Sequence, residues 1–298
     1  MRRRDISSKA GFVALIGRPN AGKSALINAF VNDRIAMTSR KAGATRKKQL
    51  AIVTRGDSQI IFIDTPGLDN QSGKLRDFMR KEAQNAIEGA DLNVFLADMA
   101  DRTDNYETFL SVGGGKQHIV ALTKMDNFTN ERRIKKLAEY QKFSDRFLAI
   151  VPVSAKKNDF APLLDEIAKR LPSRPFYYDP DDLTDLSVRE IYAEMIRQAL
   201  LDSFNDEVPY ACCVEIESFA EDERLDKISA KIFVEKPSQM AIVIGKNGAG
   251  VKRVGVKARL LMEQFSQKKV FLRLEVAALR AWSKDDKQLA RFGYRGGV

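Results

Sequence analysis

One loop near the N-terminus constrains the fold of this chain more than any other feature of its sequence. The loop consists of Gly17, Arg18, Pro19, Asn20, Ala21, Gly22, Lys23 and Ser24. An apolar run at residues 11–16 precedes it, and a helical pattern of apolar side chains follows at Leu26, Ile27 and Phe30. A strand, a glycine-rich turn and a helix in this order are the setting that a phosphate-binding P-loop requires. The sequence therefore predicts a P-loop whose backbone N–H groups hold phosphates at the start of a helix.

Two side chains at the end of this loop have roles that the motif predicts. Lys23 reaches the β- and γ-phosphate oxygens, and Ser24 supplies a ligand for Mg²⁺. Asp64 follows the apolar run at residues 60–63, so it lies at the end of a buried strand and can complete the magnesium site. The turn after it consists of Thr65, Pro66 and Gly67. We expect the backbone N–H of this glycine to sense the γ-phosphate, although the tetrapeptide alone also fits a surface turn.

Two further motifs predict the base of the nucleotide. The first consists of Thr123, Lys124 and Asp126, and the second of Ser154, Ala155 and Lys156. Each closes a strand-like apolar run. The carboxylate of Asp126 can accept hydrogen bonds from N1–H and the exocyclic amino group of guanine, which adenine cannot supply. A backbone N–H of the second motif would meet the guanine carbonyl, so GTP and GDP are the expected nucleotides.

Strand-like and helical patterns alternate through the first half of the chain. Beyond the P-loop, strand-like runs lie at residues 50–53, 60–63, 92–96, 118–123 and 147–153. Charged helical stretches separate them, as at residues 74–87 and 130–142. Alternation of this kind predicts an α/β domain with a mostly parallel sheet covered on both faces.

The order of these motifs along residues 11–156 resembles that of the translation-factor-related GTPases. The resemblance implies that Thr45 joins Mg²⁺ in the GTP state, although Ala44 stands where that class often has a second threonine. It also implies that Lys23, Thr45 and Gly67 are the catalytic residues. Thr123 replaces the asparagine usual in the class, which implies somewhat weaker binding of guanine.

Hydrolysis by this chain is expected to be slow without help. Leu68 stands where Ras-like GTPases have a glutamine that positions water, and an aliphatic side chain cannot orient a water molecule. In GTPases that resemble this loop, the asparagine, here Asn20, often binds K⁺ near the phosphates. The resemblance therefore implies that K⁺ stimulates hydrolysis.

A G-x-x-G loop lies between two helical stretches at residues 238–265. Strand-like runs at residues 211–218 and 228–234 precede it, and one at residues 270–276 follows it. This is the pattern of a KH module, an α+β fold whose glycines let the backbone approach phosphate beside a groove for about four single-stranded nucleotides. A plain loop between two helices is the alternative. The expected RNA contacts are Ala241, Ile244, Gly245, Lys246, Asn247, Gly248, Lys252 and Arg253.

Charge is distributed unevenly along the chain, whose net charge is +10. Residues 1–175 contain 31 basic and 20 acidic side chains, residues 176–226 contain 3 and 15, and residues 227–298 contain 16 and 5. The basic last quarter favours a polyanionic partner, either nucleic acid or an anionic membrane surface. The alternative is a solvated basic face.

The first charge switch coincides with three prolines, Pro172, Pro175 and Pro180. Proline-rich stretches of this kind mark loops and domain boundaries. We therefore expect a P-loop GTPase domain at residues 1–172, a linker at 173–186 and an RNA-binding domain at 187–298, which opens with an amphipathic helix over 187–204.

With both halves considered, the chain resembles the Era family, bacterial GTPases in which a G domain precedes a type II KH domain, over residues 11–294. The resemblance implies a switch protein in which GTP orders residues 38–48 and 68–75. It also implies binding of single-stranded RNA near the 3′ end of the small-subunit ribosomal RNA and a role in assembly of the 30S subunit. One alternative is a constitutive RNA-binding module whose nucleotide is structural. Another places the GTPase at the cytoplasmic face of the inner membrane, with residues 2–4 meeting anionic lipid.

Other features argue against further chemistry. No apolar run approaches the ~18–20 residues that span a bilayer, so we expect a cytoplasmic protein, and a monomer. Cys212 and Cys213 are adjacent in an apolar stretch and are expected to fill the core. His118 is the only histidine, which excludes a histidine-based triad or metal site. Trp282 is expected to pack rather than to stack on a ligand.

Overall fold

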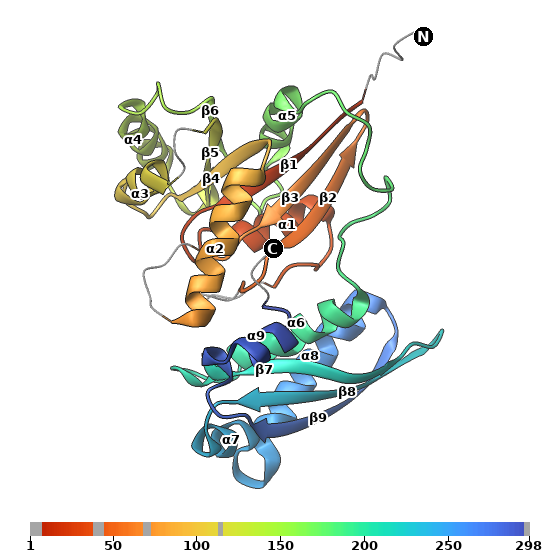
Figure 1. Ribbon diagram of the computed structural model, residues 1–298. Helices are drawn as coiled ribbons and strands as arrows, with labels where there is room; N and C mark the ends of the chain where they lie inside the picture. The colour runs from red at the N-terminus through yellow and green to blue at the C-terminus, as the bar shows by residue number, and fades with distance from the viewer. Residues whose placement is uncertain (1–7, 38–44, 68–72, 113–115, 295–298) are drawn as a thin grey trace. The chain divides into compact units, whose positions relative to one another are not determined.

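The computed structural model describes residues 8–37, 45–67, 73–112 and 116–294 (Figure 1). The described residues form two compact units, one made of residues 8–36, 45–67, 80–112 and 116–185 and the other of residues 37, 73–79 and 186–294. Each unit has its own hydrophobic core and is described separately.

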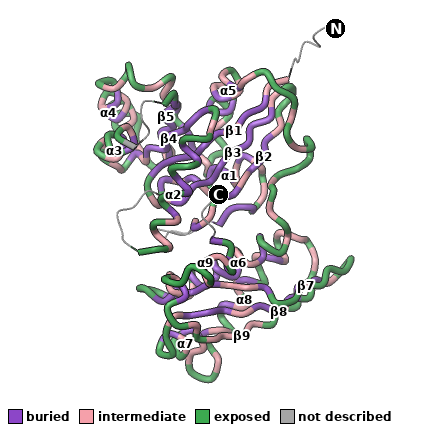
Figure 2. Tube along the Cα trace, viewed as in Figure 1, coloured by how far each residue is buried: buried purple, intermediate pink, exposed green. Residues whose placement is uncertain are grey.

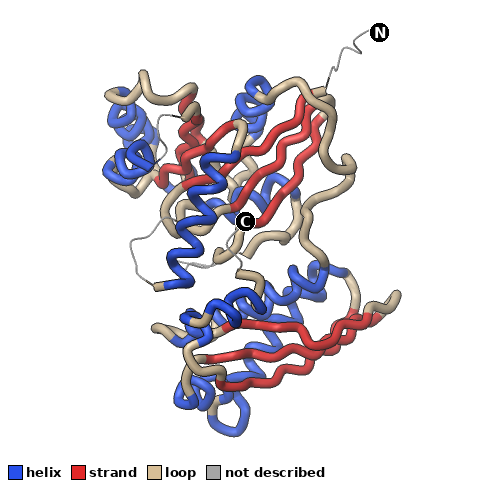
Figure 3. The backbone as a smooth tube through the Cα atoms, viewed as in Figure 1, coloured by secondary structure: helices blue, strands red, loops and turns tan. Residues whose placement is uncertain are grey.

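A six-stranded sheet, whose strands are red in Figure 3, forms the centre of the first unit. Its strand order is β2-β3-β1-β4-β5-β6. Its strands are β1 (Lys9–Ile16), β2 (Gln49–Arg55), β3 (Ser58–Asp64), β4 (Leu92–Asp98), β5 (His118–Thr123) and β6 (Ala149–Pro152). β2 runs antiparallel to β3, and the other neighbouring strands run parallel. The prediction of a mostly parallel sheet is confirmed.

Helices cover both faces of this sheet. They are α1 (Lys23–Val31), α2 (Lys74–Gly89), α3 (Asp104–Val112), α4 (Asn130–Gln141) and α5 (Ala161–Arg170), with a 3₁₀ turn, η1, at Met125–Asn127. Alternate residues of β1 supply two cores, because successive side chains of a strand point to opposite faces. Val13 and Leu15 pack with α1 and α5, whereas Ala14 and Ile16 pack with α2, α3 and α4. The sheet is accordingly the most buried part of the unit (Figure 2).

The proline-containing segment at residues 173–185, which we call the strap, is held against this sheet. Gln59 of β3 is fully buried and clasps it: the side-chain carbonyl accepts hydrogen bonds from the backbone N–H groups of Tyr177 (2.8 Å) and Tyr178 (3.1 Å). The amide nitrogen of Gln59 donates to the carbonyl of Tyr178 at 2.9 Å. Arg174 lies 3.1 Å from the carboxylate of Asp91. The segment expected to be a linker is thus bonded to the first unit along much of its length.

The end of the strap also pairs with β2, an edge strand of the sheet. The N–H of Ile52 donates to the carbonyl of Leu183 at 2.9 Å, and the hydroxyl of Thr184 donates to the carbonyl of Leu50 at 2.7 Å. These bonds satisfy backbone groups that an open edge would leave to solvent.

The second unit is built on a three-stranded sheet in the order β7-β8-β9. Its elements are α6 (Val188–Leu201), η2 (Val208–Ala211), β7 (Cys213–Ala220), β8 (Leu225–Val234), α7 (Pro237–Ile244), η3 (Lys246–Gly248), α8 (Ala249–Ser266), β9 (Lys269–Ala278), η4 (Trp282–Lys284) and α9 (Asp286–Arg291). β8 is antiparallel to β7 and parallel to β9. This α-β-β-α-α-β order is that of the expected type II KH fold. Side chains of α6, α7 and α8 pack on one face of the sheet.

Local sequence explains where these elements begin. α6 starts after Ser187, whose hydroxyl accepts from the N–H of Glu190 while the Glu190 carboxylate accepts from the N–H of Ser187, a capping box. The strand expected to start at residue 211 starts instead at Cys213, because Pro209 lies in the 3₁₀ turn η2 just before it.

The expected core residues of the second unit are buried. Cys212 and Cys213 are buried thiols, and that of Cys212 donates to the carbonyl of Val208 at 3.1 Å. Trp282 is fully buried, its indole N–H donates to the carbonyl of Ala211 at 2.9 Å, and its ring packs against those of Phe292 and Tyr294. The predictions for the two cysteines and the tryptophan are confirmed. Among the described residues, no helix is both long and apolar enough to cross a membrane.

Candidate nucleotide site and RNA-binding loop

The P-loop turns from the end of β1 into the start of α1. Gly22 caps the helix with φ 98°, in the left-handed region that favours glycine. Gly17 has no room for a side chain, because a Cβ there would lie 2.8 Å from the carbonyl of Leu96 in β4. The ammonium group of Lys23 lies inside the turn, 2.9 Å from the carbonyl of Gly17 and 3.0 Å from that of Arg18. Lys23 is the first residue of α1, and the backbone N–H groups at the start of a helix can bind an anion.

Three hydroxyl and carboxylate groups predicted to hold Mg²⁺ come together although they lie on separate elements. The hydroxyl of Ser24 donates to Oδ2 of Asp64 at 2.9 Å, and that of Thr45 donates to the same oxygen at 3.4 Å. The two hydroxyl oxygens are 3.2 Å apart. Hard oxygen donors of this kind are the ligands that Mg²⁺ prefers.

Asp64 also presents a buried oxygen for which the described residues provide no hydrogen bond, Oδ1. A buried polar atom without a partner costs free energy, so its presence in a functional loop calls for a ligand. Burial raises the pKa of Asp64 to about 6, against the opposing effects of the Lys23 ammonium and the hydroxyl groups of Ser24 and Thr45. Burial likewise lowers the pKa of Lys23 to about 8, although Asp64 opposes this shift. Burial thus disfavours the charged form of each group. A bound cation would stabilise the charged form of Asp64, and bound phosphates would stabilise that of Lys23.

The turn after Asp64 packs directly on the P-loop. Thr65 donates its hydroxyl hydrogen to the carbonyl of Leu15 at 2.7 Å. A Cβ on Gly67 would lie 2.7 Å from the backbone nitrogen of Pro19, so only glycine fits this approach. The predictions for Leu68 and Ala44 fall outside the described residues, as do residues 38–44 and 68–72 of the predicted switch segments at 38–48 and 68–75.

The motif at the end of β5 is bonded to the P-loop. The hydroxyl of Thr123 donates to the carbonyl of Ala21 at 2.8 Å, so threonine supplies a hydrogen bond where the family usually has asparagine. Lys124 donates to the carbonyl of Asn20 at 2.8 Å. These bonds tie the predicted base site to the predicted phosphate site.

Asp126 is oriented by the motif that follows β6. The hydroxyl of Ser154 donates to Oδ1 of Asp126 at 2.7 Å. This hydrogen bond, with smaller contributions from nearby Lys156 and Lys157, holds the pKa of Asp126 below its ordinary value. The carboxylate is therefore an ionised acceptor at neutral pH, as binding of guanine N–H groups requires. Ala155 lies between the two polar members of this motif.

Two aspartates that the sequence interpretation did not single out belong to the same surroundings. Asp98, the last residue of β4, forms an ion pair with Lys124 at 2.5 Å. Asp101 lies 3.1 Å from the guanidinium of Arg18. The position of Asp98 at the carboxyl end of a parallel strand was the available signal, because ligands of open α/β sheets bind at that edge.

In the second unit, the G-x-x-G loop has the backbone that its glycines predict. Gly245 has φ 71° and Gly248 has φ 76°, and Asn247 between them has φ 52°. A Cβ on Gly245 would lie 2.8 Å from the backbone nitrogen of Gly250. The loop is therefore a tight turn with its backbone close to the surface, and Lys246 at its tip is exposed.

The other predicted RNA contacts differ in their exposure. Ala241 and Lys252 are exposed and Ile244 is half-buried. Arg253 is exposed, and its guanidinium donates to the carbonyl of Ser203 at 3.1 Å and lies 5.3 Å from the centre of the Phe204 ring. Its contact with RNA stays a prediction.

Comparison with known proteins places these features in a family. Residues 12–124 match the family described as 50S ribosome-binding GTPase, and residues 207–283 match the KH domain family. GTPase Era of Helicobacter pylori strain P12 is 48% identical over 295 residues, which cover 97% of this chain and 98% of that protein. The chain belongs to the Era family of GTPases.

Solved Era structures have the same fold over almost the whole chain. A variant of Aquifex aeolicus Era bound to GDP·AlF₄⁻ has a TM-score of 0.90 and 30% identity, covering 96% of this chain and 99% of that one. Era in complex with MgGDPNP and nucleotides 1506–1542 of 16S ribosomal RNA matches with the same TM-score, identity and coverage. The Era-family chain is thus a GTPase with a C-terminal KH domain, and the alternative of a nucleotide that is never turned over is not favoured.

Proposed function

We propose that this Era-family GTPase binds GTP with Mg²⁺ at the P-loop and single-stranded RNA from the 3′ end of small-subunit ribosomal RNA at its KH loop. The observation that carries the proposal is the convergence of Ser24, Thr45 and Asp64 on one point beside the P-loop, in a chain that also carries a tight G-x-x-G turn. The Era structure with MgGDPNP and 16S nucleotides supports both halves.

In the proposed nucleotide site, each group of the chain has a distinct task. Lys23 and the N–H groups at the start of α1 neutralise the phosphates, and Asp126 selects guanine. The hydroxyl groups of Ser24 and Thr45 and the buried oxygen of Asp64 would hold Mg²⁺, whose charge offsets that of the β- and γ-phosphates. Ser24 and Thr45 would then exchange their present hydrogen bonds to Asp64 for the metal.

In the proposed hydrolysis, Lys23, Thr45 and Gly67 contribute mainly charge and position. Lys23 stabilises negative charge that develops on the β–γ bridge, and the N–H of Gly67 donates to the γ-phosphate. Asn20 would bind K⁺ near the phosphates. Its backbone carbonyl already accepts from Lys124, and its φ of 66° holds the loop in an open turn.

In the proposed RNA site, the glycines of the G-x-x-G turn let phosphates approach the backbone, and Lys246 and Lys252 add exposed positive charge. Ala241 and Ile244 would meet the bases. The proposal extends to a monomeric factor that assists 30S assembly in the cytoplasm, with the domain limits given by residues 1–172 and 187–298. Contact with the inner membrane is a separate expectation, tested by flotation of the protein with anionic liposomes at ~0.15 M salt.

The test of the RNA site compares lysine variants in fluorescence anisotropy with labelled RNA of nucleotides 1506–1542 and a non-hydrolysable GTP analogue. Replacement of both Lys246 and Lys252 with alanine removes two phosphate contacts. Binding should weaken, and the slope of log K against log salt should become less steep by about 1–2.

A matched control removes an exposed lysine elsewhere. Lys135→Ala on α4 leaves the KH loop intact, and its affinity and salt slope should match those of the unaltered protein. If the double variant binds as tightly as the control, RNA does not bind at this loop.

A further inference from the structure

The β7–β8–β9 sheet has a second face, opposite to the one that the helices cover, and part of it is open. Ile228, Ala230 and Ile232 of β8 point into the core with the helices. Residues between them point the other way, because side chains alternate along a strand. At the end of this second face, the C-terminal segment covers Phe233 and Cys213 with Trp282 and Phe292.

The middle of this face is closed by ion pairs. Lys231 forms an ion pair with Glu217 at 2.5 Å and with Glu275 at 3.9 Å, and Arg273 lies 2.8 Å from Glu275. Acidic side chains in this zone are therefore paired with basic ones. Beyond it, towards the beginning of β8 and β9, the face is open.

An exposed aromatic ring stands in this open zone. Phe271 of β9 is 61% exposed, compared with 46% for Tyr177. It lies in register with Lys227 of β8. The next pair on this face is Ser229 with Arg273. We call these four residues the platform.

Small side chains border the platform on β7. Ala220 is paired in register with Lys227, and Ser218 with Ser229. Both are exposed. They border Lys227 and Ser229 of β8, which separates them from Phe271 on β9.

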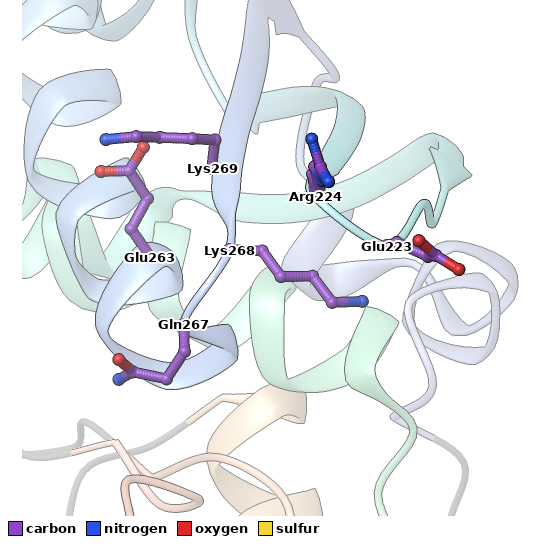
Figure 4. Close-up of a pocket in the computed structure, with 6 residues that line it drawn as sticks. All are labelled: Glu223, Arg224, Glu263, Gln267, Lys268 and Lys269. Atoms are coloured by element: carbon purple, nitrogen blue, oxygen red, sulfur yellow. The ribbon is translucent and has the colours of Figure 1, made fainter.

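A charged pocket of about 360 Å³ lies at the start of β9, the strand that carries Phe271 (Figure 4). It is lined by Glu223, Arg224, Glu263, Gln267, Lys268 and Lys269. Lys268 and Lys269 extend in opposite directions, and Lys268 is 2.8 Å from Glu221, so that carboxylate is neutralised. Lys269 stands two residues before Phe271 on the same strand and is exposed. Lys227 and Lys269 are thus exposed basic side chains beside the ring, and Arg273, two residues after Phe271, adds a guanidinium that also pairs with Glu275.

We propose that the platform is a second RNA-contacting surface of this chain, on which a base stacks on Phe271 while Lys227, Lys269 and Arg273 contact the flanking phosphates. An exposed aromatic ring on a sheet among basic side chains is the arrangement by which sheet surfaces bind single-stranded RNA. A KH groove holds only about four nucleotides, so a longer RNA extends beyond it. The inference rests on the proposed function, because it concerns the same RNA partner.

The test compares two RNAs, both labelled, with the full chain and a non-hydrolysable GTP analogue. The long RNA comprises nucleotides 1506–1542, and the short one comprises five nucleotides from the 3′ end that fill the groove alone. Phe271→Ala should weaken binding of the long RNA by roughly 5- to 150-fold, the effect of losing one stacked base, and leave the short RNA unaffected. Phe271→Tyr should restore long-RNA binding, because tyrosine has a ring that stacks.

Leu260→Ala serves as the matched control, because Leu260 is an exposed apolar side chain of the same unit, 50% exposed on α8. It should bind both RNAs as the unaltered protein does. Since Phe271 is mostly exposed, its variant should also retain the melting temperature.

The outcomes separate the two proposals. Equal binding of the long RNA by Phe271→Ala and the unaltered protein overturns the platform while the KH proposal stands. Equal weakening for both RNAs also overturns it, as does a change in the sedimentation of the RNA-free protein, which would assign Phe271 to contacts between copies. Failure of the unaltered chain to bind either RNA refutes the proposed function and, with it, the platform.

Discussion

Replacement of Asp126 with asparagine should weaken GDP binding by an amount that follows from the hydrogen bonds of its carboxylate. In Asp126→Asn, the side-chain oxygen still accepts from Ser154, which now lies 2.7 Å from Oδ1, so the new amide group points to the base. Guanine presents two N–H donors there and loses two bonds to a charged acceptor, each worth about 1.5–3 kcal/mol. A total loss of about 3–6 kcal/mol raises the Kd for GDP by roughly 10²- to 10⁴-fold.

The same variant should prefer a different base. Xanthine has a carbonyl where guanine has its amino group, so it accepts the hydrogen bond that the asparagine amide donates. Titration with fluorescent GDP and XDP measures both affinities. Ser154→Ala is the control: it frees the carboxylate without changing its chemistry, so GDP binding should weaken by about tenfold or less and guanine should remain preferred. Retention of tight GDP binding by Asp126→Asn would refute the assignment of the base site.

Three further predictions concern stability and ions. The ring of His118 is held by two hydrogen bonds: its Nδ1–H donates to the carbonyl of Lys116, and its Nε2 accepts from Tyr106 at 2.7 Å. Burial lowers the pKa of His118, so the unfolded chain binds a proton more readily than the folded one. The free energy of unfolding should therefore fall as pH drops below about 6.5. Urea titrations from pH 7 to pH 5 should show a shallower dependence for His118→Gln, and identical slopes would contradict this. Gln59→Leu should lower the free energy of unfolding by about 2–4 kcal/mol and speed proteolysis within the strap, because the N–H groups of Tyr177 and Tyr178 and the carbonyl of Tyr178 lose their partner. An unchanged urea midpoint would show that these hydrogen bonds do not stabilise the protein. GTP hydrolysis should be faster in KCl than in NaCl, and Asn20→Asp should remove the difference; equal kcat values in the two salts rule out K⁺ stimulation.

Much of the first unit could be predicted because its signals are local. Apolar runs mark β1, β3 and β5, and the P-loop fixes the start of α1. The predicted helices at 74–87 and 130–142 correspond to α2 and α4 within a few residues. α3 and α5 were not predicted, because each is only about ten residues long and so offers few turns of periodic pattern.

Long-range contacts were beyond local reasoning. The strap looked like a linker because its prolines and acidic residues are typical of one, and its bonds come from Gln59, more than a hundred residues earlier. The pairs of Lys124 with Asp98 and Arg18 with Asp101 likewise join separate loops. The hydrogen bond of Arg253 to the carbonyl of Ser203 also joins residues 50 positions apart, and no local pattern indicates it.

The central claim is that the nucleotide at the P-loop controls RNA binding at the KH loop. The most direct test is fluorescence anisotropy of labelled RNA from the 3′ end of small-subunit ribosomal RNA, titrated in KCl with a non-hydrolysable GTP analogue, with GDP, or without nucleotide. We predict that the analogue alone gives tight binding. Equal affinity in all three states would contradict the claim and leave a KH domain that binds RNA independently of GTP.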